Sequence, residues 1–139
     1  MNNLNNRARF TPEGVMKVLA SGRLPKFTSL GLDVPPRFDL ARILNHPAAG
    51  RLTSLRLNGE DALVAVARSR QLTRLETLEL IGRRVVLTSE GVTELLANPA
   101  LSGVRTFHIW LMYDGNFHIT PDDVARLRDR FGPDIGIGG

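Results

Sequence analysis

The sequence contains no cysteine, which excludes disulfide bonds, thiolate nucleophiles and zinc sites built on cysteine. Lysine is nearly absent, because Lys17 and Lys26 are the only two and arginine supplies the remaining basic charge. No apolar run approaches the roughly 18–20 residues that span a bilayer, and the polar segment Met1–Arg7 lacks the apolar core of a secretory signal. We therefore expect a soluble, cytoplasmic protein that has no membrane partner.

The chain also lacks concentrated charge and nucleotide-binding motifs. Its 139 residues carry a formal net charge of +4, and the arginines are spread from Arg7 to Arg130, unlike the clustered basic surface of a dedicated nucleic-acid-binding protein. Neither G-x-x-x-x-G-K-[ST] nor G-x-G-x-x-G occurs, so nucleotide binding has no support. A phosphate or nucleic-acid site would require Arg83, Arg84 and Arg105 to converge, and we do not expect nucleic acid as a partner.

What the chain does contain is a short apolar phrase, L-x-x-L-x-L or a close variant, that recurs along it. The middle anchors follow one another after 25, 23 and 29 residues, and a truncated copy, Ile135-Gly-Ile137, comes 28 residues after the last. A repeat of about 20–29 residues built on this phrase is the signature of a leucine-rich solenoid. The full copies are Phe27–Leu30–Leu32, Leu52–Leu55–Leu57, Leu75–Leu78–Leu80 and Val104–Phe107–Ile109.

Each phrase is preceded by a stretch that predicts a helix. Two are near-copies, Thr11-Pro-Glu-Gly-Val-Met-Lys-Val-Leu-Ala20 and Thr88-Ser-Glu-Gly-Val-Thr-Glu-Leu-Leu-Ala97, and a third variant opens at Thr120. Each threonine is a candidate N-cap whose hydroxyl accepts a hydrogen bond from a free backbone N–H. Shorter helices are expected from Asp39 to Leu44 and from Asp61 to Arg68.

The phrases alternate apolar and polar residues, which is typical of strands with one buried and one exposed face. We expect Phe107 and Ile109 to point into the core, and His108 and Trp110 away from it. Helix followed by strand, repeated about four to five times, predicts an α/β fold with parallel strands and helices on a single side. Because the helical layer is wider than the strand layer, the array should bend into a right-handed horseshoe segment, with strands on the concave side and helices on the convex side.

One repeat cannot bury its own apolar face. We therefore expect residues 1–139 to form a single leucine-rich repeat domain. Residues 1–10 are interpreted as a polar N-terminal extension, and residues 135–139 as a weak last strand or a frayed tail.

The helix phrase T-x-E-G-V-x-x-L-L-A resembles that of bacterial leucine-rich repeat proteins of the ribonuclease-inhibitor-like type, in which each repeat pairs a strand with an α-helix. The resemblance runs from about Thr11 to Ile137. It implies binding on the concave face, although one fold can host many tasks. The family commonly places Asn or Cys three residues after the third anchor. Those positions here are Pro35, Glu60, Arg83 and Met112.

Alternation places three columns of side chains on the exposed face. Tryptophan and arginine are among the residues most often found as interface hot spots, so we predict a protein- or peptide-binding site there, made of Arg56, Asn58, Glu79, Ile81, His108 and Trp110. The columns are Ser29–Ser54–Thr77–Thr106, Gly31–Arg56–Glu79–His108 and Asp33–Asn58–Ile81–Trp110.

Simpler explanations compete with this site. Trp110 could pack against a neighbouring strand or the loop near Asp114-Gly115, and Arg56 with Glu79 could form a surface ion pair worth under about 1 kcal/mol. The alternative function is structural: a capping segment of a larger repeat protein, or a solenoid that self-associates through its ends.

Catalysis has little support. None of His46, His108 and His118 belongs to a metal-binding pattern. His118 with Asp114, or Asp122 with Asp123, could be imagined as an acid–base or metal pair, but the aspartates are better explained as residues that begin a helix. We therefore predict a protein that is not an enzyme and has no catalytic residues, metal or cofactor.

Overall fold

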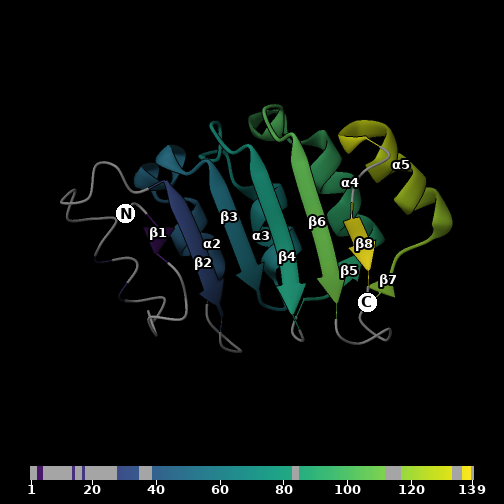
Figure 1. Ribbon diagram of the computed structural model, residues 1–139, viewed down its shortest axis with the longest axis horizontal. Helices are drawn as coiled ribbons and strands as arrows, with labels where there is room; N and C mark the ends of the chain where they lie inside the picture. Colours follow the sequence, from purple (N-terminus) through teal and green to yellow (C-terminus); the bar gives the residue numbers. More distant parts are fainter. Residues whose placement is uncertain are drawn as a thin grey trace.

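The structure is a computed structural model that describes residues 3–4, 14, 17, 28–34, 39–82, 85–111, 117–132 and 136–138. These residues form a mixed α/β structure whose main sheet has six strands in the order β1-β2-β3-β4-β6-β8, with every neighbouring pair parallel (Figure 1). The strands of this sheet are β1 (Asn3–Leu4), β2 (Ser29–Asp33), β3 (Ser54–Asn58), β4 (Thr77–Gly82), β6 (Thr106–Leu111) and β8 (Gly136–Gly138).

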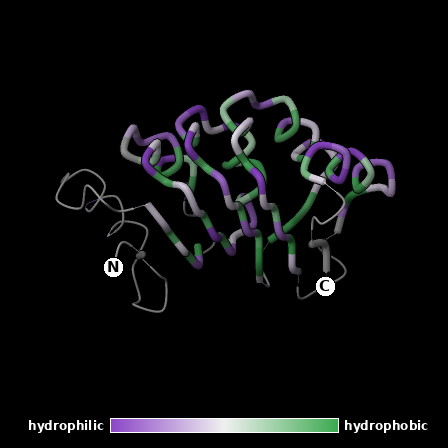
Figure 2. Tube along the Cα trace, turned by 45° about the horizontal axis from the view of Figure 1, so that its top comes forward, coloured by the Kyte–Doolittle hydropathy of each residue, from purple (hydrophilic) through white to green (hydrophobic). Residues whose placement is uncertain are grey.

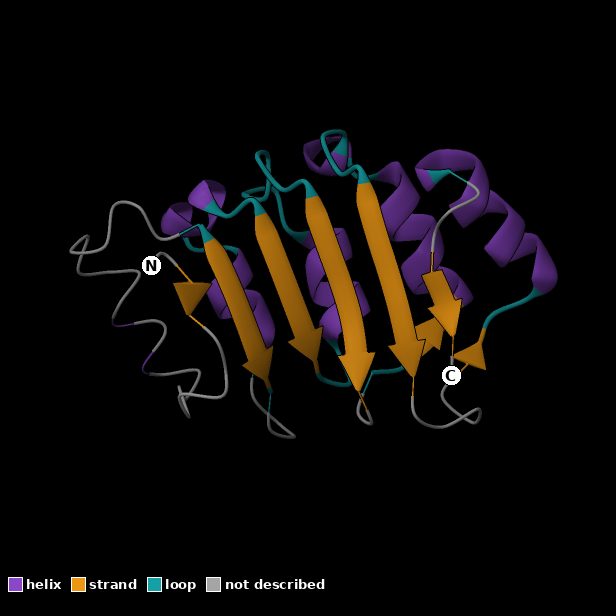
Figure 3. Cartoon of the chain, in the orientation of Figure 1, coloured by secondary structure: helices purple, strands orange, loops and turns teal. Residues whose placement is uncertain are grey.

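The helices lie together on one face of the sheet, behind the strands as drawn in Figure 3. Adjacent helices contact one another in chain order, α2 with α3, α3 with α4 and α4 with α5. The helices are α2 (Leu40–Leu44), α3 (Ala62–Arg68), α4 (Ser89–Ala97) and α5 (Pro121–Phe131), with 3-10 turns η2 (Pro47–Arg51) and η3 (Pro99–Leu101).

Helix starts follow the predicted caps. The Thr88 hydroxyl accepts a hydrogen bond from the backbone N–H of Gly91 at 3.0 Å, and the Asp39 carboxylate accepts one from Ala41 at 3.1 Å. Asp61 is at the N-cap of α3 but makes no side-chain cap. The helix predicted from Thr11 to Ala20 lies mostly outside the described residues.

The repeated apolar phrases form the core. Leu30, Leu55, Leu78 and Phe107 are partners in register across β2, β3, β4 and β6, and all four are buried. Phe27, the first anchor of the first copy, lies outside the described residues. Hydrophobic and hydrophilic residues alternate along the strands (Figure 2), as predicted. Since burying a leucine or phenylalanine side chain is worth about 1.5–3 kcal/mol, this stack is the main stabilising feature.

Two buried polar side chains join successive repeats where helices end. The Ser69 hydroxyl donates to the carbonyl oxygen of Leu44 at 2.6 Å, and the Asn98 amide donates to Ser69 at 2.7 Å and Ala67 at 3.0 Å. These bonds satisfy carbonyls that a helix end leaves unpaired. Of the loop positions where the family commonly has Asn or Cys, Glu60 is exposed. The other three, Pro35, Arg83 and Met112, lie outside the described residues.

Three short strands, β1, β5 (Leu87–Thr88) and β7 (Phe117–His118), were not predicted, and a fourth, β8, was left open. β1 lies within the segment interpreted as a polar extension, and β5 pairs in parallel with β7 outside the main sheet. β8 pairs with β6. Of the two alternatives given for residues 135–139, a weak last strand is therefore found at Gly136–Gly138. Every helix in the described part of the chain is too short or too polar to cross a bilayer.

Candidate functional site

The side chains of β2, β3, β4 and β6 that do not point into the core form one surface, which we call the open face. The helices cover the other face of the sheet (Figure 3). The structure places all of the predicted site residues on the central and C-terminal strands of the open face. They are Arg56, Asn58, Glu79, Ile81, His108 and Trp110.

The backbone register fixes which of these residues are neighbours. Arg56 is the partner of Glu79, Glu79 is the partner of His108, and Ile81 is the partner of Trp110. Directly opposite residues on neighbouring strands are about 4.8 Å apart. The predicted second column is therefore a continuous row from Gly31 to His108. The third column is paired in two halves, Asp33 with Asn58 and Ile81 with Trp110, because the register of β3 with β4 ends at Leu57 and Leu80.

Trp110 is exposed rather than packed away. Its relative exposure is 55%, and it is the one large hydrophobic side chain that is exposed among the described residues. Its neighbours on the same strand, Phe107 and Ile109, are buried, so the alternation predicted for this strand is confirmed. An exposed tryptophan that is held on a rigid strand is preorganised for contact with a partner.

The predicted ion pair between Arg56 and Glu79 is wrong. Although the two residues are register partners, neither makes an ion pair or a side-chain hydrogen bond with any residue in the described ranges. The physical reason is that Arg56 is exposed and Glu79 is half-buried at the surface, where an ion pair gains little Coulomb energy and loses side-chain entropy. Both charges are therefore available to a partner.

Beside Trp110, the open face continues as bare backbone. The register pairs His108 with Gly136 and Trp110 with Gly138 on β8, and glycine carries no side chain. The sequence pattern had suggested only a weak strand here, because glycine is uncommon in strands. The consequence for the site is a strip along one flank of Trp110 where β8 contributes no side chain.

Asn58 and Gly82 are fitted to each other at the end of the site where β3 and β4 finish. The Asn58 amide donates to the carboxylate of Asp33 at 3.0 Å. Gly82 has a φ of +136°, and a Cβ added there would lie 2.3 Å from Cγ of Asn58. Gly82 therefore provides both a conformation that other residues rarely adopt and the space that Asn58 occupies.

Gly82→Ala should lower the free energy of unfolding by at least about 1–3 kcal/mol, the range for a residue held in a strained backbone region. Gly132→Ala is the matched control, because Gly132 also has a positive φ, +96°, but has nothing within 4 Å of the added Cβ. Urea denaturation should show the larger loss for Gly82→Ala. Equal losses in the two variants would contradict the close fit with Asn58.

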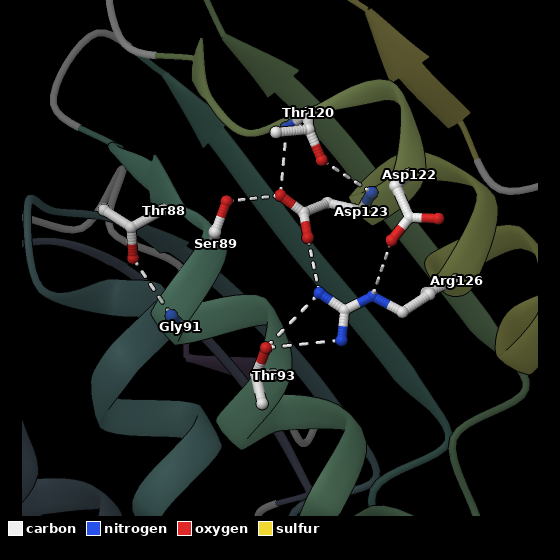
Figure 4. Close-up of polar contacts among 8 residues, drawn as sticks. All are labelled: Thr88, Ser89, Gly91, Thr93, Thr120, Asp122, Asp123 and Arg126. Atoms are coloured by element: carbon white, nitrogen blue, oxygen red, sulfur yellow. Dashed lines mark hydrogen bonds and ion pairs between the residues drawn. The ribbon is translucent and has the colours of Figure 1, made fainter.

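A separate polar cluster joins α4 to α5 (Figure 4). The buried Asp123 carboxylate accepts hydrogen bonds from the hydroxyl of Ser89, the backbone N–H of Thr120 at 2.9 Å and the guanidinium of Arg126. The Thr120 hydroxyl accepts from the Asp123 N–H at 3.1 Å, which completes a capping box. Arg126 also approaches Thr93 on α4 at 3.3 Å.

This arrangement confirms that Asp123 is a helix-start residue, as predicted. Ser89 and Arg126 were not among the residues predicted from the sequence. The spacing of Arg126, three residues after Asp123 and four after Asp122, was a usable signal because such pairs are neighbours on a helix. No local signal pointed to Ser89, since its contact with Asp123 depends on how the two helices pack.

These bonds hold the pKa of the Asp123 carboxyl well below its usual range. The Ser89 hydroxyl has the largest effect, followed by the Thr120 N–H and the Arg126 side chain, and all three favour the ionised form. Asp122 lies 3.9 Å from Nε of Arg126 and is exposed. At neutral pH the Asp123 carboxylate is therefore ionised, and its hydrogen bonds hold α4 and α5 together. Both of its oxygens already accept hydrogen bonds.

Asp123→Asn should destabilise the protein at pH 7, and this deficit should shrink in acid. The folded-state pKa of Asp123 is lowered, so its stabilising contribution is present above the unfolded value of about 3.9 and is lost as the pH falls toward the folded pKa. Urea unfolding of both proteins from pH 7 down to about 2 measures this. A deficit that stays constant across that range would contradict an ionised Asp123.

Neither metal binding nor an arginine-based anion site gains support from the described residues. They contain no group of three or more side chains that could hold a metal ion. Arg105 is exposed. The two arginines with which it would have to converge, Arg83 and Arg84, lie outside the described ranges. Asp114, the imagined partner of His118, also lies outside them.

Comparison with known proteins finds no matching family model, no similar curated protein and no similar solved structure.

Proposed function

We propose that this chain is a short leucine-rich repeat solenoid of the ribonuclease-inhibitor-like type, and that the open face is its concave inner side. Three observations support this assignment. Apolar phrases recur every 23 to 29 residues; the strands that contain them are parallel and in register; and the helices lie on one side of the sheet only (Figure 1). A one-sided stack of this kind bends toward its strands.

Its function, on this proposal, is to bind a protein or peptide on the open face without catalysing a reaction. The observation that carries the proposal is the exposed Trp110, which lies on a regular strand of the open face. The same face carries two charged residues, Arg56 and Glu79, that have no partners among the described side chains. A large aromatic anchor with polar groups around it is the usual composition of an interface hot spot. Exposed hydrophobic side chains that serve no contact are common, but this one shares the open face with two unpaired charges.

The competing proposal is a structural role, either as a capping segment of a larger repeat protein or as a solenoid that self-associates through its ends. The outer edges of β2 and β6 are partly paired with the short strands β1 and β8. Short edge strands discourage association between sheet edges. This favours the binding role, in which the open face, not the ends, meets the partner.

A pull-down from native lysate tests the proposal, with the wild-type protein beside the double variant Arg56→Ala/Trp110→Ala. Both side chains are exposed, so the variant should match the wild type in thermal stability, and a variant that unfolds would place Trp110 in the core instead. We expect a specific partner that the wild type retains and the variant loses. If neither protein retains one and the solution mass rises with concentration, self-association is the better account.

A further inference from the structure

The charged and aromatic residues of the open face are arranged in a fixed order across three strands. Arg56 lies on β3, Glu79 on β4 and Trp110 on β6. Because Glu79 pairs with His108, Trp110 is two residues further along its strand than the partner of Glu79. The three side chains therefore follow a path across the sheet in the order base, acid, aromatic, which we call the diagonal. Its first step, from Arg56 to Glu79, is directly across to the register partner, and its second step, from Glu79 to Trp110, is diagonal.

The spacing along this diagonal follows from sheet geometry. Neighbouring strands are about 4.8 Å apart and each residue rises about 3.3 Å. Arg56 and Glu79 are thus about 5 Å apart at Cα, Glu79 and Trp110 about 8 Å, and Arg56 and Trp110 about 12 Å. An extended peptide presents alternate side chains on one face about 6.6 Å apart, so its positions i and i+4 are about 13 Å apart. Long side chains can absorb the small differences.

Resting on the proposed function, we propose that the partner is an extended peptide segment that carries a carboxylate at position i, a base at i+2 and an apolar or aromatic side chain at i+4, in either chain direction. The carboxylate pairs with Arg56, the base with Glu79, and the apolar side chain packs on Trp110 over the bare backbone of Gly136 and Gly138. Each group of the peptide meets a complementary group on the open face.

A row of hydroxyls lies beside the Arg56–Glu79 end of the diagonal, two residues before each of them on its strand, and suits the backbone of such a peptide there. Ser54, Thr77 and Thr106 are partners in register and are half-buried. Among the described residues none of their hydroxyls is hydrogen bonded. A hydroxyl can donate and accept, so this row can bond the N–H and C=O groups that one edge of an extended peptide leaves exposed.

The test is selection from a displayed library of random linear peptides against the wild-type protein and two charge-reversed variants, Arg56→Glu and Glu79→Lys. Wild-type selections should converge on acid, base and apolar residues at i, i+2 and i+4. Arg56→Glu should select a base at i, and Glu79→Lys an acid at i+2. Arg42→Glu, which makes the same charge change at an exposed position on α2, should select the wild-type pattern.

A synthetic peptide of the wild-type pattern should bind Arg56→Glu at least about tenfold more weakly than wild type, because like charges across an interface are strongly unfavourable, and binding should weaken as salt increases. Convergent selections that ignore both charge reversals would overturn the inference while leaving the open-face function standing. If no peptide is enriched on the wild-type protein, both this inference and peptide binding by the open face fail.

Discussion

Phe107→Ala should lower the free energy of unfolding by about 3–5 kcal/mol, the cost of removing a buried phenylalanine. The Phe107 side chain is 1% exposed, pairs in register with Leu78 on β4, and makes an edge-to-face contact with Phe131 on α5 at 5.1 Å between ring centroids. It therefore links the sheet to the last helix. Since a domain of this kind is stable by about 5–15 kcal/mol in total, the loss is a large share of its stability.

Urea denaturation followed by circular dichroism measures this effect, and the midpoint of thermal unfolding should fall by roughly 10–20 °C. Thr106→Ala is the control on the same strand, because Thr106 is half-buried and points to the open face. It should change stability by about 0.5 kcal/mol or less. A loss below about 1 kcal/mol for Phe107→Ala would contradict the placement of this ring in the core.

Trp110→Ala should weaken partner binding and leave stability nearly unchanged, whereas Phe107→Ala mainly lowers stability. The two residues lie three positions apart on β6 but point to opposite faces of the sheet, and Trp110 is 55% exposed. The free energy of unfolding should therefore change by about 0.5 kcal/mol or less. The dissociation constant for the captured partner or a selected peptide should rise at least about 30-fold, which corresponds to about 2 kcal/mol and is the threshold of a hot spot.

Isothermal titration calorimetry measures this change, with His118→Ala as a control at an exposed position outside the main sheet. That control should bind as the wild type does. If Trp110→Ala binds normally while remaining folded, the aromatic anchor lies elsewhere.

Periodic elements could be predicted from the sequence and tertiary contacts could not. The strands through Leu55, Leu78 and Phe107 and the helix after Thr88 were found because apolar residues recur at strand or helix spacing. The two-residue strands β5 and β7 have no such period, so nothing local marks them.

The polar contacts divide in the same way: those between residues close in sequence were predicted, and those between distant residues were not. The caps by Thr88 and Thr120 act within a few residues and were predicted. The bonds that Ser69 and Asn98 make to the preceding repeats join residues more than twenty positions apart, and depend on how the repeats stack. One contact predicted from adjacency does not form. Arg56 and Glu79 are lateral neighbours as predicted, but they make no ion pair. The reason is that an ion pair at the protein surface gains little energy.

At the candidate site, alternation was sufficient to choose which side chains face outward. It could not say that Trp110 is exposed, because exposure depends on what the neighbouring strands place beside it. On one side of Trp110 the neighbouring strand is β8, which places Gly136 opposite His108 and Gly138 opposite Trp110.

The fluorescence of Trp110 tests the central claim most directly, because it is the only tryptophan in the chain and lies on the open face. In the free protein its emission should resemble that of tryptophan in water, and acrylamide should quench it efficiently. Addition of a saturating partner or selected peptide should shift the emission to shorter wavelength and protect it from quenching, since the ring becomes covered. Binding that is confirmed independently but leaves both the emission and the quenching unchanged would contradict the account, because the partner would then meet another surface.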